Sequence, residues 1–159
     1  MEKNIYLAPG AYIIGDVTLG KDVGIWYNAV VRGDTGSIFI GDGSNVQDNC
    51  TLHTDAGHSI HIGRGVSIGH GAIVHGCTVG DNTVVGMGSI LLNGCVVGRN
   101  CIIGAGALIT GKMNIPDNSV VVGNPGRILR QMAEEEVAAN RKNAAHYLDL
   151  KRAALEKTN

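Results

Sequence analysis

Residues 79–104 read VGDNTVVGMGSILLNGCVVGRNCIIG. An aliphatic residue followed by glycine recurs here in steps of six, at Val79, Val85, Val97 and Ile103. The same register, carried in both directions, falls on Ile13, Leu19, Ile25, Val31, Ile40, Val46, Leu52, Ile62, Ile68, Val74, Leu91, Ile109, Ile115 and Val121. Short β segments with one inward aliphatic side chain, followed by a glycine that permits a tight turn, predict a parallel β-helix. With three hexads in each triangular coil, these eighteen positions predict about six coils.

The register shifts at three places. Three extra residues stand between Val31 and Ile40, four stand between Leu52 and Ile62, and one is missing between Val74 and Val79. We expect the first two insertions to form loops.

The composition divides the chain into two parts. All 24 glycines precede residue 127, and aromatic residues make up only 4% of the chain, as stacked layers of small aliphatic side chains would require. The glycine-free tail places Val137, Ala144 and Leu148 on one helical stripe, which predicts a helix from about Glu134 to Lys151. We therefore expect a β-helix over residues 1–125 and a helical segment over 126–159 that packs on it, as a single domain.

Charge and cysteine content exclude several classes of protein. A net charge of −1 without a basic cluster in the repeats argues against nucleic-acid binding. No apolar stretch is long enough for a membrane span, and no signal peptide is recognisable, so a cytoplasmic protein is expected. The four cysteines form no CxxC pair, and each precedes a repeat aliphatic by two residues. We expect them to be free thiols that fill the core.

Three side chains fall on one face in successive coils. Arg32, His53 and His75 each directly follow a repeat aliphatic residue of that face. Because adjacent rungs are about 4.8 Å apart, two stacked histidines can bind one cation at a Zn–N distance of about 2.1 Å. The spacing therefore predicts a metal ion between His53 and His75, whereas His58 and His146 fit no such position.

His70 belongs to a different face. It follows Ile68 by two residues, so it joins the other two histidines only from a neighbouring prism. A site shared in this way predicts a cyclic oligomer, for which a triangular prism favours a trimer, and three histidines with an open fourth position are typical of catalytic zinc. Gln47 and Asp48 stand one coil before Gly69 and His70, so we expect them beside that histidine.

Two segments resemble the γ-class carbonic anhydrase family of hexapeptide-repeat proteins. They are VVRGDTGSIFIGDGSNVQDNCTLHTD (residues 30–55) and IGHGAIVHGCTVG (residues 68–80). The resemblance spans nearly the whole chain, and it implies a left-handed β-helix and a homotrimer with a divalent metal at each interface. The metal that the resemblance implies is zinc, with iron(II) or cobalt(II) as alternatives. The motif residues that carry the resemblance are Arg32, Asp34, Gln47, Asp48, His53, His70 and His75.

The resemblance also implies a role for each residue. His53 and His75 are similar to the ligands from one subunit, and His70 to the ligand from its neighbour. Arg32 and Asp34 resemble an interface ion pair that helps to hold bicarbonate. Gln47 resembles the residue that orients a metal-bound hydroxide, Asp48 belongs to the interface network, and Tyr147 resembles a tyrosine that reaches the site in some relatives. The implied reaction is the reversible hydration of CO2 to bicarbonate, in which the metal lowers the pKa of its water.

The sequence departs from the family pattern at two points. Thr35 stands where a glutamate assists proton transfer, and the loop Thr54–Ser59 lacks a long acidic excursion. Three alternatives therefore stay open. They are a hexapeptide-repeat acyltransferase with one histidine as general base, an acyl-CoA thioesterase that uses the metal site, and a metal-stabilised trimeric scaffold without carbonic anhydrase activity.

Overall fold

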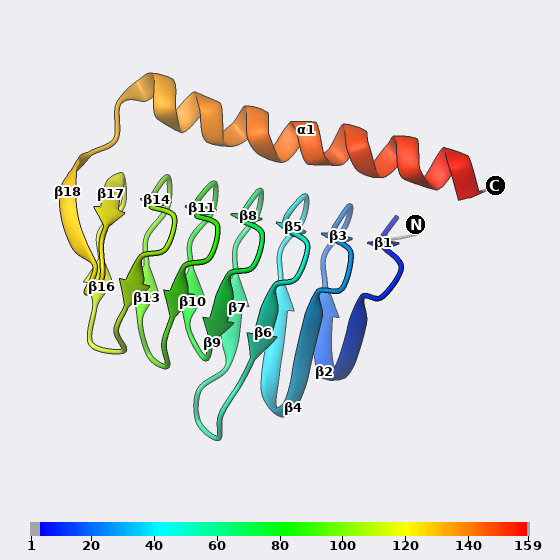
Figure 1. Cartoon of the computed structure of the whole chain (residues 1–159), viewed down its shortest axis with the longest axis horizontal. Coiled ribbons are helices and arrows are strands. Elements are labelled where there is room, and N and C mark those ends of the chain that lie inside the picture. The colour runs from blue at the N-terminus through cyan, green and yellow to red at the C-terminus, as the bar shows by residue number, and fades with distance from the viewer. Residues whose placement is uncertain (1–3, 159) are drawn as a thin grey trace.

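The chain forms a parallel β-helix of about six turns, along which one long helix runs (Figure 1). The computed structural model describes residues 4–158. Short strands alternate with turns, and each coil places its strands beside those of the next coil. The predicted fold class, mainly β with a C-terminal helix, is confirmed. Within the described residues, no helix combines the length and apolar character needed to cross a membrane.

One face of the prism is an eight-stranded sheet that ends in an antiparallel pair. In spatial order its strands are β1 (Tyr6–Leu7), β3 (Gly24–Ile25), β5 (Asn45–Val46), β8 (Ser67–Ile68), β11 (Val84–Val85), β14 (Ile102–Ile103), β17 (Ser119–Val122) and β18 (Arg127–Gln131). The strands from β1 to β17 are parallel and pair in register, as a coil repeat requires.

The other two faces form one ten-stranded sheet, because the long strand β4 takes part in both. Its order is β15 (Leu108–Ile109), β12 (Ile90–Leu91), β9 (Ile73–His75), β6 (Thr51–His53), β4 (Val30–Ile40), β7 (Ile60–Ile62), β10 (Thr78–Val79), β13 (Val96–Val97) and β16 (Asn114–Ile115), with β2 (Tyr12–Leu19) paired to β4. The first half of β4 pairs with β6 and its second half with β7.

The core consists of the repeat aliphatic residues. All of them are buried except Ile13, which is half-buried and packs against the same cluster. Cys50, Cys77, Cys95 and Cys101 are buried and free, as predicted. Burial raises the pKa of the Cys50 thiol to about 11, which keeps it protonated.

The first predicted loop is wrong. The extra residues between Val31 and Ile40 lie inside the continuous strand β4, whose pairing with β2 is irregular between Gly15 and Val17. Gly15 has a φ of +78°, and a Cβ atom there would lie 2.3 Å from the carbonyl oxygen of Gly33, so only glycine fits. The second predicted loop, residues 54–59, is a turn that projects from the prism between β6 and β7 (Figure 1).

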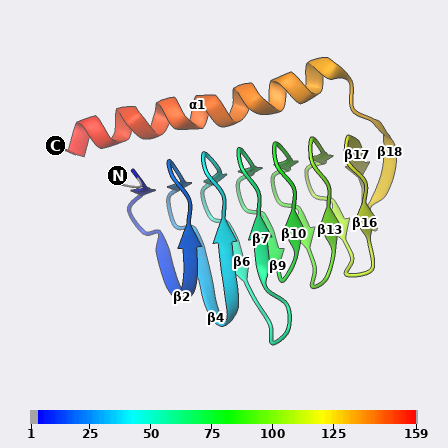
Figure 2. The same ribbon diagram turned by 180° about the vertical axis from the view of Figure 1, so that it is seen from behind.

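The C-terminal helix α1 (Glu134–Thr158) begins at the predicted residue and extends beyond the predicted end at Lys151. It runs along the solenoid back toward the first coil (Figure 2). Strand β18, between the repeats and α1, was not predicted. The expected division of the chain at residue 125 stays a prediction.

Two polar side chains attach α1 to the repeats. The buried Asn140 amide donates hydrogen bonds to the carbonyl oxygens of Asn82 and Cys101, at 3.0 and 3.1 Å. Near the other end, the buried Lys151 ammonium donates to the carbonyl oxygen of Asn4 at 2.7 Å and to Asp22 Oδ1 at 2.6 Å. These contacts hold the helix at both ends of its path.

Candidate functional site

The ends of three neighbouring strands bring three predicted site residues into one column. Arg32 on β4 pairs with His53 on β6, and His53 pairs with His75 on β9, each in parallel register. The stack predicted from the register is therefore present. Both histidines are half-buried at a corner of the prism, where β6 and β9 end.

The two histidine rings meet through one nitrogen each. His53 Nδ1 lies 3.0 Å from His75 Nε2, and the rings are packed edge to face with centroids 5.0 Å apart. The other nitrogen of each ring contacts a polar side chain. His53 Nε2 lies 3.1 Å from Asp34 Oδ1, and His75 Nδ1 lies 2.6 Å from Asn93 Oδ1.

Asp34 connects this column to Arg32. Its Oδ2 accepts a hydrogen bond from Arg32 Nη1 at 2.7 Å. Desolvation opposes ionisation of Asp34, but the hydrogen bond from His53 and the charge of Arg32 outweigh it and lower the pKa of this carboxyl group. Because an ionised carboxylate only accepts hydrogen bonds, His53 Nε2 carries the proton of the neutral ring, in which Nδ1 keeps a lone pair. That lone pair is the one directed at His75.

A second group of predicted residues lies by the eight-stranded sheet. His70, just after β8, places its Nδ1 2.7 Å from Asp48 Oδ2, and its Nε2 lies 3.3 Å from the Tyr147 hydroxyl on α1. Asp48 Oδ1 accepts a hydrogen bond from the backbone N–H of Tyr27 at 3.2 Å. In the neutral ring, the carboxylate therefore fixes the proton of His70 on Nδ1 and leaves a lone pair on Nε2, the nitrogen that faces the Tyr147 hydroxyl.

Gln47 and Tyr147 line a cavity of about 410 Å³ between α1 and the eight-stranded sheet. Gln47 is buried and donates from Nε2 to Asn45 Oδ1 at 3.0 Å. Tyr147 packs its ring against Trp26, with centroids 5.5 Å apart, and burial followed by the charge of Asp48 raises its pKa. Tyr147 thus contacts His70 and also packs the helix. The remaining lining residues are His70, Asn143 and mostly apolar residues of β11 and β14 and the turns that follow them.

The predicted residues therefore form two groups in the protomer. Arg32, Asp34, His53 and His75 contact one another, and Gln47, Asp48, His70 and Tyr147 gather at the other sheet. Among residues 4–158, one group of acidic, cysteine or histidine side chains could hold a metal ion within a single protomer. It consists of His53, Asp55 and His75, whose ligand atoms all lie within 4.8 Å of one another. His70 is not among them, so one protomer does not unite the three predicted ligands.

Asn93 and Asp55 contact the candidate site, and the sequence reasoning did not single them out. Asn93 lies in the turn after β12, one residue beyond Leu92, the position that the pairing of β12 with β9 places beside His75, so the register alone does not identify it. Asp55 follows His53 by two residues and accepts a hydrogen bond from Asn93 Nδ2 at 2.8 Å. Thr35, the departure from the family pattern, donates from its hydroxyl to the backbone carbonyl of Thr54 and thus stabilises the neighbouring turn.

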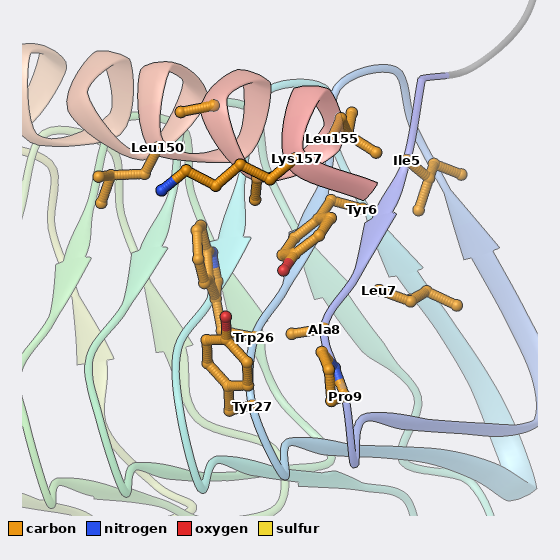
Figure 3. A pocket seen from close by; sticks show the side chains of 12 residues that line it. Ile5, Tyr6, Leu7, Ala8, Pro9, Trp26, Tyr27, Leu150, Leu155 and Lys157 are labelled. Atoms are coloured by element: carbon orange, nitrogen blue, oxygen red, sulfur yellow. The ribbon is translucent and has the colours of Figure 1, made fainter. Parts of the chain in front are cut away.

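A larger cavity, of about 880 Å³, lies between the first coils and the end of α1. Figure 3 shows Tyr6, Trp26 and Tyr27 grouped beneath the helix, and Leu7 and Pro9 lie to the right of this aromatic group. Lys157 is the charged residue of this lining. The cavity walls therefore supply neither a carboxylate nor an imidazole for metal binding.

Comparison with known proteins identifies relatives of two kinds. Residues 76–111 match the family described as "Bacterial transferase hexapeptide (six repeats)". The chain is 53% identical to a "Probable carbonic anhydrase" of Methanocaldococcus jannaschii, over 94% of each chain. It is 42% identical to "Gamma carbonic anhydrase 1, mitochondrial" of Arabidopsis thaliana, over 96% of this chain and 58% of that protein. Among solved structures, a hexapeptide transferase family protein from Anaplasma phagocytophilum is similar, with a TM-score of 0.89, 38% identity and coverage of 96% of this chain and 90% of that one.

Proposed function

Because the chain belongs to the γ-class carbonic anhydrase-like family of hexapeptide-repeat proteins, we propose that it catalyses the reversible hydration of CO2 to bicarbonate. The proposed site is a divalent metal ion at each interface of a homotrimer. His53 and His75 hold the ion from one subunit, and His70 of the partner subunit provides the third ligand. Zinc is the ion we assign. The four free, buried thiols suit a reducing compartment, and we assign the protein to the cytoplasm.

The observation that carries this proposal is the pair of nitrogens 3.0 Å apart between His53 and His75. Hydrogen bonds to Asp34 and Asn93 occupy the opposite nitrogen of each ring. Two ring nitrogens directed at each other need a proton or a cation between them, since their lone pairs repel. Each of the three proposed ligands also has an oxygen acceptor on its other nitrogen, the arrangement typical of metal-binding histidines. The donor set therefore fits a borderline-soft divalent cation such as zinc.

A zinc ion held by these histidines would supply Lewis-acid chemistry and would lower the pKa of a bound water toward neutrality. The protein's own residues orient the reactants. Gln47, anchored on Asn45, presents its carboxamide to the cavity beside His70 and can orient the attacking water. The Arg32 guanidinium, 44% exposed and fixed by Asp34, can bind bicarbonate through charge-assisted hydrogen bonds. The apolar lining of the cavity suits the nonpolar CO2.

The two groups of site residues favour a trimeric assembly. They lie on different sheets of one protomer, and a cyclic arrangement of prisms brings the His70 group of one copy to the His53 group of the next. Asp48 and Tyr147 would then position His70 from its own subunit.

We predict that the purified protein is a trimer with close to one divalent metal per chain, and that it accelerates CO2 hydration. The measurement is stopped-flow hydration with zinc and with anaerobically loaded iron(II), together with metal analysis after purification without chelators. His75→Ala should remove both metal and activity, whereas His146→Ala on the exposed helix surface should change neither. A rate equal to that of buffer with both metals would contradict the proposed reaction.

One observation favours acyl transfer as a second candidate. The His70–Asp48 pair, 2.7 Å apart, lies beside the apolar cavity, and a histidine oriented by a carboxylate can act as general base. The solved hexapeptide transferase structure has the same fold. Release of free thiol from acetyl-CoA with amine acceptors tests this alternative, and activity that persists in His75→Ala but is lost in His70→Ala would support it.

A further inference from the structure

A chain of hydrogen bonds reaches His75 from the side opposite His53. Asp55, in the turn after β6, accepts a hydrogen bond from Asn93 Nδ2 at 2.8 Å. Asn93, in the turn after β12, places its Oδ1 2.6 Å from His75 Nδ1. Three successive coils contribute to this network, because His53 and His75 pair in register and Asn93 follows β12, the strand that pairs with β9.

The carboxylate of Asp55 determines how the Asn93 amide and the His75 ring are oriented in this series of hydrogen bonds. An ionised carboxylate only accepts, so the Asn93 amide must direct its NH2 group at Asp55 and its carbonyl oxygen at His75. That oxygen only accepts as well, so His75 Nδ1 must carry the proton. In the neutral ring of His75, the lone pair is thereby placed on Nε2, the nitrogen that faces His53.

We propose that Asn93 is a positioning residue that holds His75 in its metal-binding tautomer, and that Asp55 acts through Asn93 and is not itself a ligand. This inference rests on the metal site of the proposed function. Asp55 lies close enough to both histidines to be mistaken for a third ligand in the same protomer. Its Oδ2 accepts from Asn93 Nδ2, however, and this bond orients Asn93 Oδ1 as the acceptor for His75 Nδ1.

The first test is zinc affinity, measured by chelator competition on the full-length protein. Asn93→Leu, which conserves volume and removes both hydrogen bonds, should weaken zinc binding about 10-fold to 100-fold. Asp55→Asn keeps an oxygen that can accept from Asn93, so its affinity should stay within about 3-fold of wild type. Asp55→Leu should resemble Asn93→Leu, and the double variant should be no weaker than either, because both act on one chain of contacts.

The matched control is Thr110→Val, an isosteric change one coil further along the same face. It should leave zinc affinity unchanged. Circular dichroism and thermal melting of the metal-free proteins check folding. Because Asp55 is exposed, Asp55→Leu should not impair folding. It therefore tests the hydrogen bonds to His75 even if Asn93→Leu is unstable.

The second test reads the tautomer directly and needs no metal. The ring 15N chemical shifts of His75 in the metal-free protein should report a proton on Nδ1, and Asn93→Leu should produce a mixture of tautomers. Unchanged shifts and unchanged affinity in Asn93→Leu would overturn the inference. A greater loss in Asp55→Asn than in Asn93→Leu would also overturn it and would make Asp55 a ligand. Failure of wild type to bind zinc contradicts the proposed function instead, and the 15N spectrum then decides the tautomer by itself.

Discussion

Equal amounts of His70→Ala and His75→Ala chains, refolded together, are expected to regain about one quarter of the wild-type metal sites and activity, although neither variant alone forms a complete site. Each proposed site takes His53 and His75 from one subunit and His70 from the next. A His70→Ala chain supplies the intact pair, and a His75→Ala chain supplies the intact third ligand. Random assortment places the two in the productive order at about one interface in four.

A second mixture provides the control for this experiment. His53→Ala and His75→Ala each damage the pair that must come from one chain, since these residues stack on adjacent rungs. Their mixture should regain nothing. Zinc content and CO2 hydration of both mixtures are the measurements. Equal recovery in the two mixtures, or none in the first, would show that the ligands are not shared between subunits.

Asp22→Asn is expected to lower the free energy of unfolding by about 3 kcal/mol, because it leaves the Lys151 ammonium without a charged partner. The Lys151 side chain is 1% exposed, and its Nζ lies 2.6 Å from Asp22 Oδ1. Asparagine tolerates the φ of +58° at this position, so the substitution adds no backbone strain. Lys151→Met, which replaces the ammonium by an apolar group of similar volume, should cost less than about 1.5 kcal/mol. Urea denaturation of both variants measures the contrast, and equal losses would contradict it.

The same ion pair predicts how stability depends on pH. The hydrogen bond from Lys151 lowers the pKa of Asp22 in the folded protein. A carboxyl group with a lowered folded-state pKa contributes its stabilisation above the unfolded-state pKa, near 3.9, and loses it as the pH falls through the folded-state value. The difference in stability between wild type and Asp22→Asn should therefore be complete at pH 6 and shrink below about pH 4. A difference that stays constant down to pH 2 would assign the effect to packing.

The sequence was sufficient for the repeats because the hexad period is a local property of the chain. Burial of the register positions follows directly from it, and so does the column of Arg32, His53 and His75. The period does not say whether inserted residues leave the sheet. The residues between Val31 and Ile40 were expected to form a loop, but they extend a strand because β2 continues beside them. Strand β18 lies outside the period and therefore left no signal.

The sequence was sufficient to predict which residues belong to the candidate site. It was not sufficient to predict the hydrogen bonds that connect them. Stacking placed His53 above His75, but which nitrogen of each ring faces the other depends on rotamers and on Asp34 and Asn93. Counting one coil from His75 in the observed pairing leads to Leu92, so Asn93, one residue further, contacts His75 through its side chain and is not identified by register. Whether His70 reaches the other two histidines depends on how a second copy of the chain packs against the first. The repeat period describes contacts within one chain and does not specify that packing.

The path of α1 has a consequence for how the protein unfolds. In a solenoid whose repeats contact only their neighbours, terminal coils can fray one at a time. Here Lys151 bonds to the first coil through Asn4 and Asp22, and Asn140 bonds to a later coil through Cys101, so the helix connects coils that are distant along the prism. The first coil cannot separate without breaking the bonds of Lys151, which couples the fraying of that end to release of the helix. The helix thus converts a linear array of repeats into one cooperative unit.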